Sequence, residues 1–179
     1  GEGEQVEAAV APAMTPTLHP RLLNGVTGDP AVFVEALHAS GAVQFDCGDL
    51  SALSTGHLLR VELLCVSHTH MDHWSDLDRL LRPLIGREKL LRVVGPPGIA
   101  THLHHRLLGY TWNLVDRIPL DLVMEATEVH PLPPYPRARF RLRSGFTREA
   151  LDPLAPAPDG TLLRLGNIGL RAALVVRCR

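Results

Sequence analysis

Three histidines and one aspartate lie within residues 68–73: His68, His70, Asp72 and His73. Neutral imidazoles and a carboxylate are ligand types that suit zinc, with manganese or iron as alternatives. His68 and His70 point to the same side if the backbone there is extended, and Asp72 and His73 follow one turn later. This spacing predicts a site for one or two divalent ions that activate water for hydrolysis. The alternative is a polar loop whose histidines cap a helix, which four ligand residues in this order disfavour.

The elements on either side are expected to hold this cluster at the rim of a sheet. Residues 61–66 are an apolar run typical of a buried strand. A helix is expected to begin at Ser75, with Asp78 at capping-box spacing and paired with Arg82. Its apolar face would carry Leu77, Leu80, Leu81 and Leu84. The candidate ligands therefore lie on the turn between a core strand and a helix.

The rest of the chain alternates between strand and helix patterns. Residues 31–37 and 42–46 are expected to form adjacent antiparallel strands, and Asp46 ends the second. Residues 90–94 predict a further strand, 99–108 a helix and 120–129 another strand. Two shorter strands are expected at 161–165 and 168–176. This alternation favours an α/β fold.

An alternating run at residues 137–143 places four arginines on one face of a strand: Arg137, Arg139, Arg141 and Arg143. Such a row could follow the backbone of an RNA strand. It could equally be the charged solvent face of an edge strand.

The composition indicates one globular domain. The chain has 179 residues, 45% of them apolar, and a net charge of −1, so any RNA binding must use a local patch. Residues 1–20 are expected to be a mobile tail and residues 21–179 the domain. No apolar run has the length of a membrane span, and three cysteines without framework spacing favour reduced thiols and a cytoplasmic protein.

Other chemistry-bearing residues are expected to be structural. Cys47 and Cys65 lie in strand patterns and should be packed in the core. His102 and His105 share a helix face, where solvated histidines are the simpler interpretation. His130 follows a strand but matches no expected metal motif.

The cluster at residues 68–73 resembles the H-x-H-x-D-H signature of the metallo-β-lactamase superfamily. Residues 45–49 resemble the strand-end aspartate motif that precedes it. Ser67 and the Gly-Pro-Pro-Gly of residues 95–98 are most similar to the ribonuclease Z branch, which matures tRNA 3′ ends. The resemblance implies that His68 and His70 bind one zinc ion and that Asp72 and His73 bind the other. It also implies that Asp72 helps to activate water and that Asp46 orients the loop through hydrogen bonds.

The same resemblance implies a four-layer αββα sandwich of two similar halves, of which this chain would hold the first: a mixed, mostly antiparallel sheet with flanking helices. Arg177-Cys178-Arg179 stand where an Asp-His pair is expected, and the later ligands are missing, so one zinc ion or none could bind. A fragment, a frameshift or a partner chain would each account for this. A half sandwich is expected to expose an apolar sheet face and a free edge. It would then pair with a second copy or another chain, be stabilised by a small core of its own, or be poorly stable.

The resemblance implies a zinc-dependent hydrolase that cleaves the phosphodiester at the 3′ end of precursor tRNA. Two alternatives remain. One is a truncated or degenerate member that binds metal, RNA or a partner without turnover. The other is a hydrolase of the same fold that acts on a different ester.

Overall fold

A computed structural model describes residues 17–37, 40–166 and 168–174. The strands in these ranges are β1 (Leu18–Leu22), β2 (Val32–Ala36), β3 (Ala42–Phe45), β4 (Val61–Cys65), β5 (Lys89–Gly95), β6 (Leu122–Glu128), β7 (Tyr135–Arg141), β8 (Arg148–Leu154), β9 (Leu163–Leu165) and β10 (Ile168–Leu170). The helices are α1 (Thr55–Arg60), α2 (Met71–Trp74), α3 (Leu77–Leu81) and α4 (Ile99–Leu108), with 3₁₀ turns η1 (Val115–Arg117) and η2 (Leu142–Ser144).

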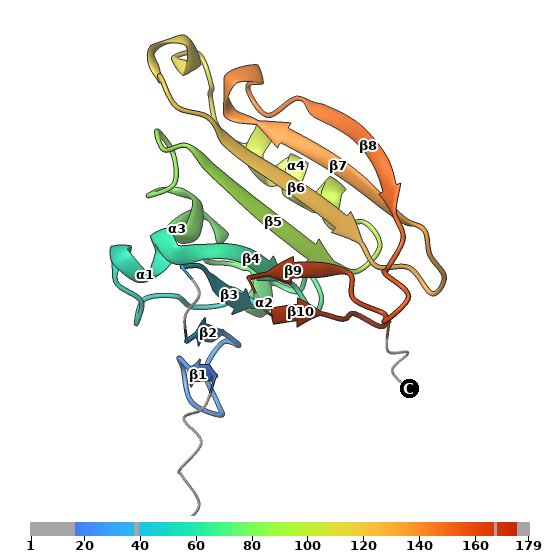
Figure 1. The fold of residues 1–179 in the computed structure, drawn as a ribbon. Helices are drawn as coiled ribbons and strands as arrows, with labels where there is room; N and C mark the ends of the chain where they lie inside the picture. Colours follow the sequence, from blue (N-terminus) through green and yellow to red (C-terminus); the bar gives the residue numbers. More distant parts are fainter. Residues whose placement is uncertain (1–16, 38–39, 167, 175–179) are drawn as a thin grey trace, which may run out of the picture.

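Strands β1 to β8 form one mixed sheet in chain order (Figure 1). The central pairs β3–β4, β4–β5 and β5–β6 are parallel, and the outer pairs are antiparallel. Parallel neighbours need crossover connections, and α1, α3 and α4 provide them. The α/β fold class is confirmed, as are the antiparallel strands predicted at 31–37 and 42–46 and the helix at 99–108.

One face of this sheet carries the main hydrophobic core. Helices α1, α3 and α4 place their leucines on it, and α4 lies behind β6 and β7 in Figure 1. The fully buried side chains include Phe33, Leu64, Leu77, Leu80, Leu91, Leu103 and Phe140. Leucine therefore supplies most of the large fully buried side chains, as expected of a chain with few aromatic residues.

The opposite face is not the bare apolar surface that was expected. The β9–β10 hairpin (red in Figure 1) contributes Leu162 and Leu165 to a second core with Val43, Leu63 and Val94. This hairpin, a two-stranded sheet, thus gives the half sandwich a small second core of its own.

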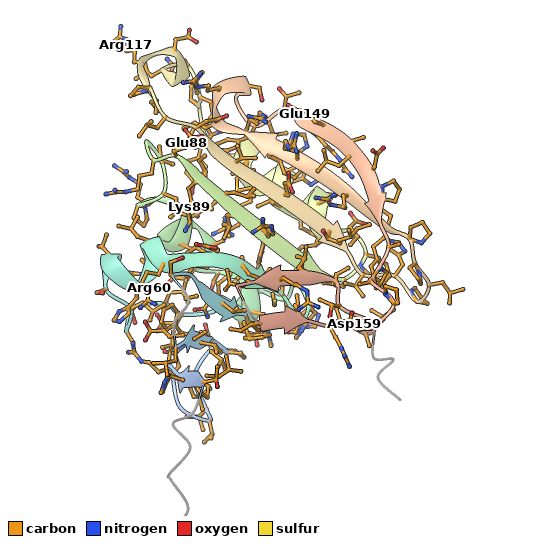
Figure 2. The ribbon with its side chains drawn as sticks, in the orientation of Figure 1. Arg60, Glu88, Lys89, Arg117, Glu149 and Asp159 are labelled. Carbon is orange, nitrogen blue, oxygen red and sulfur yellow. The ribbon has the colours of Figure 1, made fainter. Side chains whose placement is uncertain are left out.

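The rest of this face is charged. Arg92, Glu125, Arg139 and Glu149 lie directly opposite one another across β5, β6, β7 and β8, and the row ends at Glu149 (Figure 2). Alternating charges at adjacent positions attract and keep that part of the face compatible with water. The face is therefore apolar only under the hairpin, and the part on β6 and β7 is not, because these strands alternate apolar with charged residues.

Among the described residues, no strand pairs with the outer edge of β1 or of β8. The edge strands β1 and β8 each contain a proline, Pro20 and Pro153. β1 is exposed along its length and begins at Leu18, so the predicted tail of residues 1–20 overlaps it. Residues 1–16 lie outside the described residues, as do residues 175–179 with Arg177, Cys178 and Arg179.

The helix predicted from Ser75 is shorter than expected: α3 begins at Leu77 and ends at Leu81, and the separate short helix α2 lies before Ser75. Ser75 follows α2, and its hydroxyl donates to the carbonyl oxygen of Gly48 at 2.6 Å rather than capping a helix. Asp78 pairs with Arg106 of α4 at 2.8 Å, not with Arg82. Contacts with distant segments have replaced the local ones that the sequence suggested. Within the described ranges, no helix has both the length and the apolar character to cross a membrane.

Candidate metal site at the end of the parallel strands

The candidate ligands gather where two parallel strands end. Asp46 follows β3, and residues 67–73 follow β4. Parallel strands bring their carboxyl ends to the same edge of a sheet, the usual position for binding sites in α/β proteins. The two segments, 21 or more residues apart in sequence, are therefore neighbours at the rim.

The Asp46 carboxylate connects the two segments. One oxygen accepts a hydrogen bond from the backbone N–H of Ser67 at 2.7 Å. The other lies 2.8 Å from the Ser67 hydroxyl, which donates to it, and 2.8 Å from Nδ1 of His73. The Asp46 and His73 side chains are only 13% and 16% exposed. This network fixes the start of the loop and the plane of the His73 ring.

Asp46 adopts a left-handed backbone conformation with φ of 52°. Aspartate and asparagine tolerate this region better than most residues, because their short polar side chains bond locally. The turn aims the carboxylate across to the end of β4. The side-chain amide of Gln44 donates to the Asp46 carbonyl oxygen at 2.7 Å and holds the turn.

Backbone contacts lock the same two segments together. The Cys47 N–H donates to the carbonyl oxygen of His73 at 2.9 Å, and the Asp76 N–H donates to that of Cys47 at 2.9 Å. A Cβ on Gly48 would lie 1.9 Å from the carbonyl oxygen of Asp72, so only glycine fits. Gly48 and Ser67 are site residues whose roles sequence reasoning missed, although both stand inside the motifs that carried the resemblance.

The three histidines cluster. The ring centroids of His68 and His70 are 4.6 Å apart, and those of His68 and His73 are 3.9 Å apart. Asp72 is 54% exposed, and its carboxylate lies 3.5 Å from Nε2 of His73. If Nδ1 of His73 donates to Asp46, Nε2 is left with a lone pair for a ligand.

This donor set fits a divalent ion by its chemistry. In the part of the chain that the structure describes, however, no three His, Cys, Asp or Glu groups stand in the positions that a single ion would require. The rings pack on one another, so ligation would need side-chain rotation. The loop thus supplies donors of the right type but not a finished coordination sphere.

A cavity of about 770 Å³ opens beside the cluster. Its walls come from the ends of β3, β4 and β5 and from the segment after β10. They include Phe45, Asp46, Ser67, His68, His70, His73, Val94, Gly95, Pro96 and residues 170–174. The last described segment therefore faces the histidines from across the cavity.

The remaining candidates lie elsewhere. His130 is 3.4 Å from the carboxylate of Glu128, which accepts the N–H of Gly98 at the start of α4. His102 and His105 are exposed on α4. Cys47 and Cys65 are free thiols, and burial raises the pKa of both, that of Cys65 to about 12. Both thiols are therefore protonated near neutral pH in the metal-free chain.

The arginines of β7 are largely paired with acids. Arg137 and Arg139 both bond Glu125, at 2.8 and 2.7 Å, and Arg141 bonds Asp121 at 3.2 Å. Arg143 follows the strand and donates to the carbonyl oxygen of Pro119. β7 lies between β6 and β8 and is not an edge strand. The row is therefore a partly neutralised stripe on a sheet face.

The mixed sheet, the helices on one of its faces and the histidine loop at its strand ends agree with the predicted metallo-β-lactamase class. No family model matches the chain. Ribonuclease Z of Deinococcus radiodurans is 36% identical over 97 residues, which cover 51% of this chain and 29% of that protein. This similarity confirms the resemblance to the ribonuclease Z branch for half of the chain. The matched part spans less than a third of that relative's length.

A solved structure is also similar, the metallo-β-lactamase fold protein YhfI from Bacillus subtilis. It is 15% identical and covers 66% of this chain and 52% of that chain, with a TM-score of 0.37.

Proposed function

We propose that the loop of residues 67–73, held by Asp46, is the metal-binding part of a hydrolase like ribonuclease Z. The observation that carries this proposal is the cluster of His68, His70 and His73 with the Asp46–His73 bond at 2.8 Å. A helix-capping role would not require a buried carboxylate to fix an imidazole. The similarity to ribonuclease Z supports the assignment.

His68, His70 and His73 would hold a zinc ion, or two with Asp72, and manganese or iron would be alternatives. The bound ion would lower the pKa of water and stabilise negative charge at phosphorus. Asp46 holds Nδ1 of His73, which leaves Nε2 of that ring for the ion. The exposed Asp72 carboxylate is placed to accept a proton from the attacking water. The substrate we propose is the 3′ phosphodiester of precursor tRNA.

The β7 arginines are proposed to contact RNA through the N–H groups that the acids leave free, since a guanidinium has five donors. Replacing Arg139 and Arg141 with alanine should weaken RNA binding and reduce its salt dependence. Unchanged binding at low salt would remove this strand from the proposal.

We further propose a cytoplasmic location, which suits the free thiols of Cys47 and Cys65, and association with a second copy or another chain. The mass of the purified protein in solution tests the association directly. A monomer at all concentrations would contradict a homo-oligomer.

The deciding experiment is a zinc count on the purified protein, followed by cleavage of precursor tRNA and of a simple phosphodiester with added zinc or manganese. His70→Ala should lose bound zinc and activity. His102→Ala, which removes an exposed histidine from α4, is the matched control and should change neither. Equal zinc binding by both variants would refute the site.

The incomplete convergence of the ligands favours a second candidate, a protein that binds metal, RNA or a partner without turnover. Zinc binding that depends on His70, without cleavage of any phosphodiester, would support it. Cleavage of the simple phosphodiester but not of precursor tRNA would instead indicate a hydrolase of another ester.

A further inference from the structure

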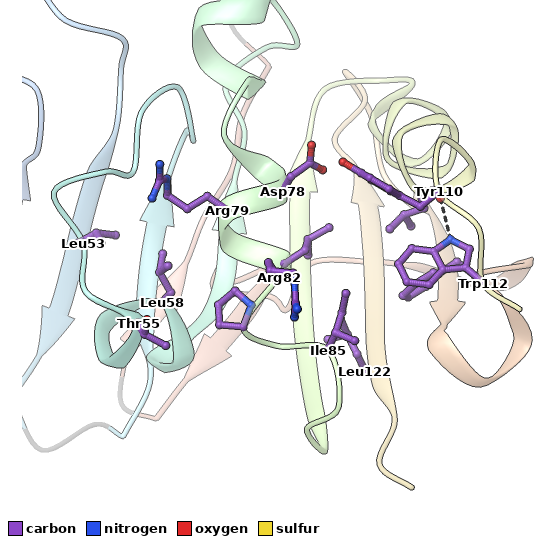
Figure 3. A pocket seen from close by; sticks show the side chains of 14 residues that line it. Leu53, Thr55, Leu58, Asp78, Arg79, Arg82, Ile85, Tyr110, Trp112 and Leu122 are labelled. Carbon is purple, nitrogen blue, oxygen red and sulfur yellow. Dashed lines mark hydrogen bonds between the residues drawn. The ribbon is translucent and has the colours of Figure 1, made fainter. Parts of the chain in front are cut away.

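A second cavity, of about 650 Å³, opens on the helix-covered face. It shares no lining residue with the histidine cavity. Its walls come from α1, α3, the end of α4 and the segments after it (Figure 3). They include Leu53, Leu58, Leu81, Ile85, Leu107, Trp112, Leu122 and Phe146. The volume and the apolar lining are those of a small-molecule site.

Aromatic side chains form one wall of this cavity. The Trp112 ring lies edge-on to Phe146, with centroids 4.7 Å apart, and 6.0 Å from the Tyr110 ring. Nε1 of Trp112 donates to the carbonyl oxygen of Leu107 at 2.8 Å, drawn as a dashed line in Figure 3. The indole is thus held in place and has its polar atom satisfied, so this wall favours a flat apolar group.

The charged side chains at the cavity differ in whether they have a partner of opposite charge. Arg106 and Tyr110 form hydrogen bonds with the Asp78 carboxylate. Partial burial alone would raise the pKa of Asp78, but these hydrogen bonds bring that pKa below its ordinary value. Asp78 is therefore an anion with a cation beside it. Arg79 is paired with Asp76 at 2.8 Å.

Arg82 is the exception among these charges. It is exposed at the cavity, and none of the described residues places an acidic side chain against it. An apolar cavity with one guanidinium that lacks a counterion complements an anion with an apolar body.

We propose that this cavity binds a small aromatic carboxylate, with its ring against Trp112 and the leucines and its carboxylate on Arg82. A neutral aromatic would fill the same space but leave Arg82 without a counterion. An aromatic cation would meet Arg82 with like charge. The site is independent of the proposed hydrolase, because no residue is common to the two cavities.

The test uses 2-naphthoate and its neutral analogue 2-naphthamide. The chain has two tryptophans, and Trp74 is buried in the main core, so Trp74→Phe leaves Trp112 as the fluorescent reporter. Both probes should quench it saturably, the acid about fivefold more tightly, as expected for one partly exposed ion pair. Arg82→Gln should abolish that preference. Arg117→Gln, at an exposed arginine outside the cavity, should preserve it.

Ile85→Trp, studied by calorimetry, should fill the cavity and abolish binding of both probes while leaving zinc binding unchanged. Equal affinity for the acid and the amide, or an acid preference that survives Arg82→Gln, would overturn the proposal. So would the absence of saturable quenching. A dimer that 2-naphthoate dissociates would assign the cavity to a second copy of the chain instead.

Discussion

Replacing Asp46 tests how the site is built, because alanine and asparagine remove different parts of its role. Asp46→Ala removes the acceptor for the Ser67 N–H, the Ser67 hydroxyl and Nδ1 of His73. Asp46→Asn keeps one acceptor oxygen. Its amide nitrogen, however, would donate to Nδ1 of His73, so that ring would carry its proton on Nε2 instead.

The expected magnitudes follow from these contacts. Hydrogen bonds to a charged group contribute about 1.5–3 kcal/mol each, and partial hydration after truncation recovers some of that. Alanine at the φ of 52° adds about 1 kcal/mol of strain. Asp46→Ala should therefore lower the free energy of unfolding by about 3–5 kcal/mol. Asn accepts this backbone conformation and should cost about 1 kcal/mol.

Zinc affinity, unlike stability, should fall strongly in Asp46→Asn. With the proton on Nε2, His73 cannot donate a lone pair to an ion, so Asp46→Asn should weaken zinc binding about 10–100-fold with little loss of stability. Urea unfolding followed by tryptophan fluorescence, a competitive zinc titration and ¹⁵N shifts of the His73 ring measure the three effects. Asp49→Asn, in the same turn but without contact to a histidine, is the matched control.

Two results would refute this reasoning. One is an Asp46→Asn variant that binds zinc as tightly as the parent chain. The other is a His73 ring in the metal-free parent that already carries its proton on Nε2.

Three further perturbations have clear expected outcomes. Gly48→Ala would place a Cβ 1.9 Å from the Asp72 carbonyl oxygen, so urea unfolding should show a loss of about 2–4 kcal/mol together with weaker zinc binding; unchanged stability would show that the loop yields. Burial raises the pKa of Cys65 from 9.0 to about 12, so iodoacetamide at pH 8 should label it far more slowly in the native than in the unfolded chain, as read by peptide mass. The stability that comes from keeping the Cys65 thiol protonated in the fold is complete below pH 9.0 and is lost as the pH rises towards 12. Rapid labelling of the native chain would contradict this burial. Burial, together with Arg148, lowers the pKa of His104 below 6.5, so NMR should find less than half of it protonated at pH 6.5. The stability that comes from keeping this ring neutral in the fold should be lost as the pH falls below 6.5.

The sequence predicted where helices and strands lie better than it predicted which segments contact one another. The helix at residues 99–108 and the strands around residues 61–66 and 90–94 follow from apolar periodicity, a local property. Ser75 also had the local signals of a helix cap. Its hydroxyl bonds Gly48 instead, 27 residues earlier in the chain. Such a choice depends on which segments become neighbours, which periodicity does not encode.

The candidate site likewise contains residues that the sequence identifies and residues that it does not. Asp46 and the histidines could be found because residue type and spacing carry the chemistry. Residues 170–174, which line the cavity, contain no ligand-type side chain, and only the family resemblance indicated that this run leads towards the site. The arginine alternation was visible in the sequence, but the selection of Glu125 as a shared partner was not, because it depends on the register between β6 and β7.

The prolines of the two outermost strands have a consequence for how copies of this protein could meet. An incoming strand at β1 or β8 would need a continuous series of amide donors, and Pro20 and Pro153 each interrupt it. Strand-by-strand growth into a fibril is thereby discouraged at both rims. Self-association would then have to join surfaces of the molecule other than the two outer strands.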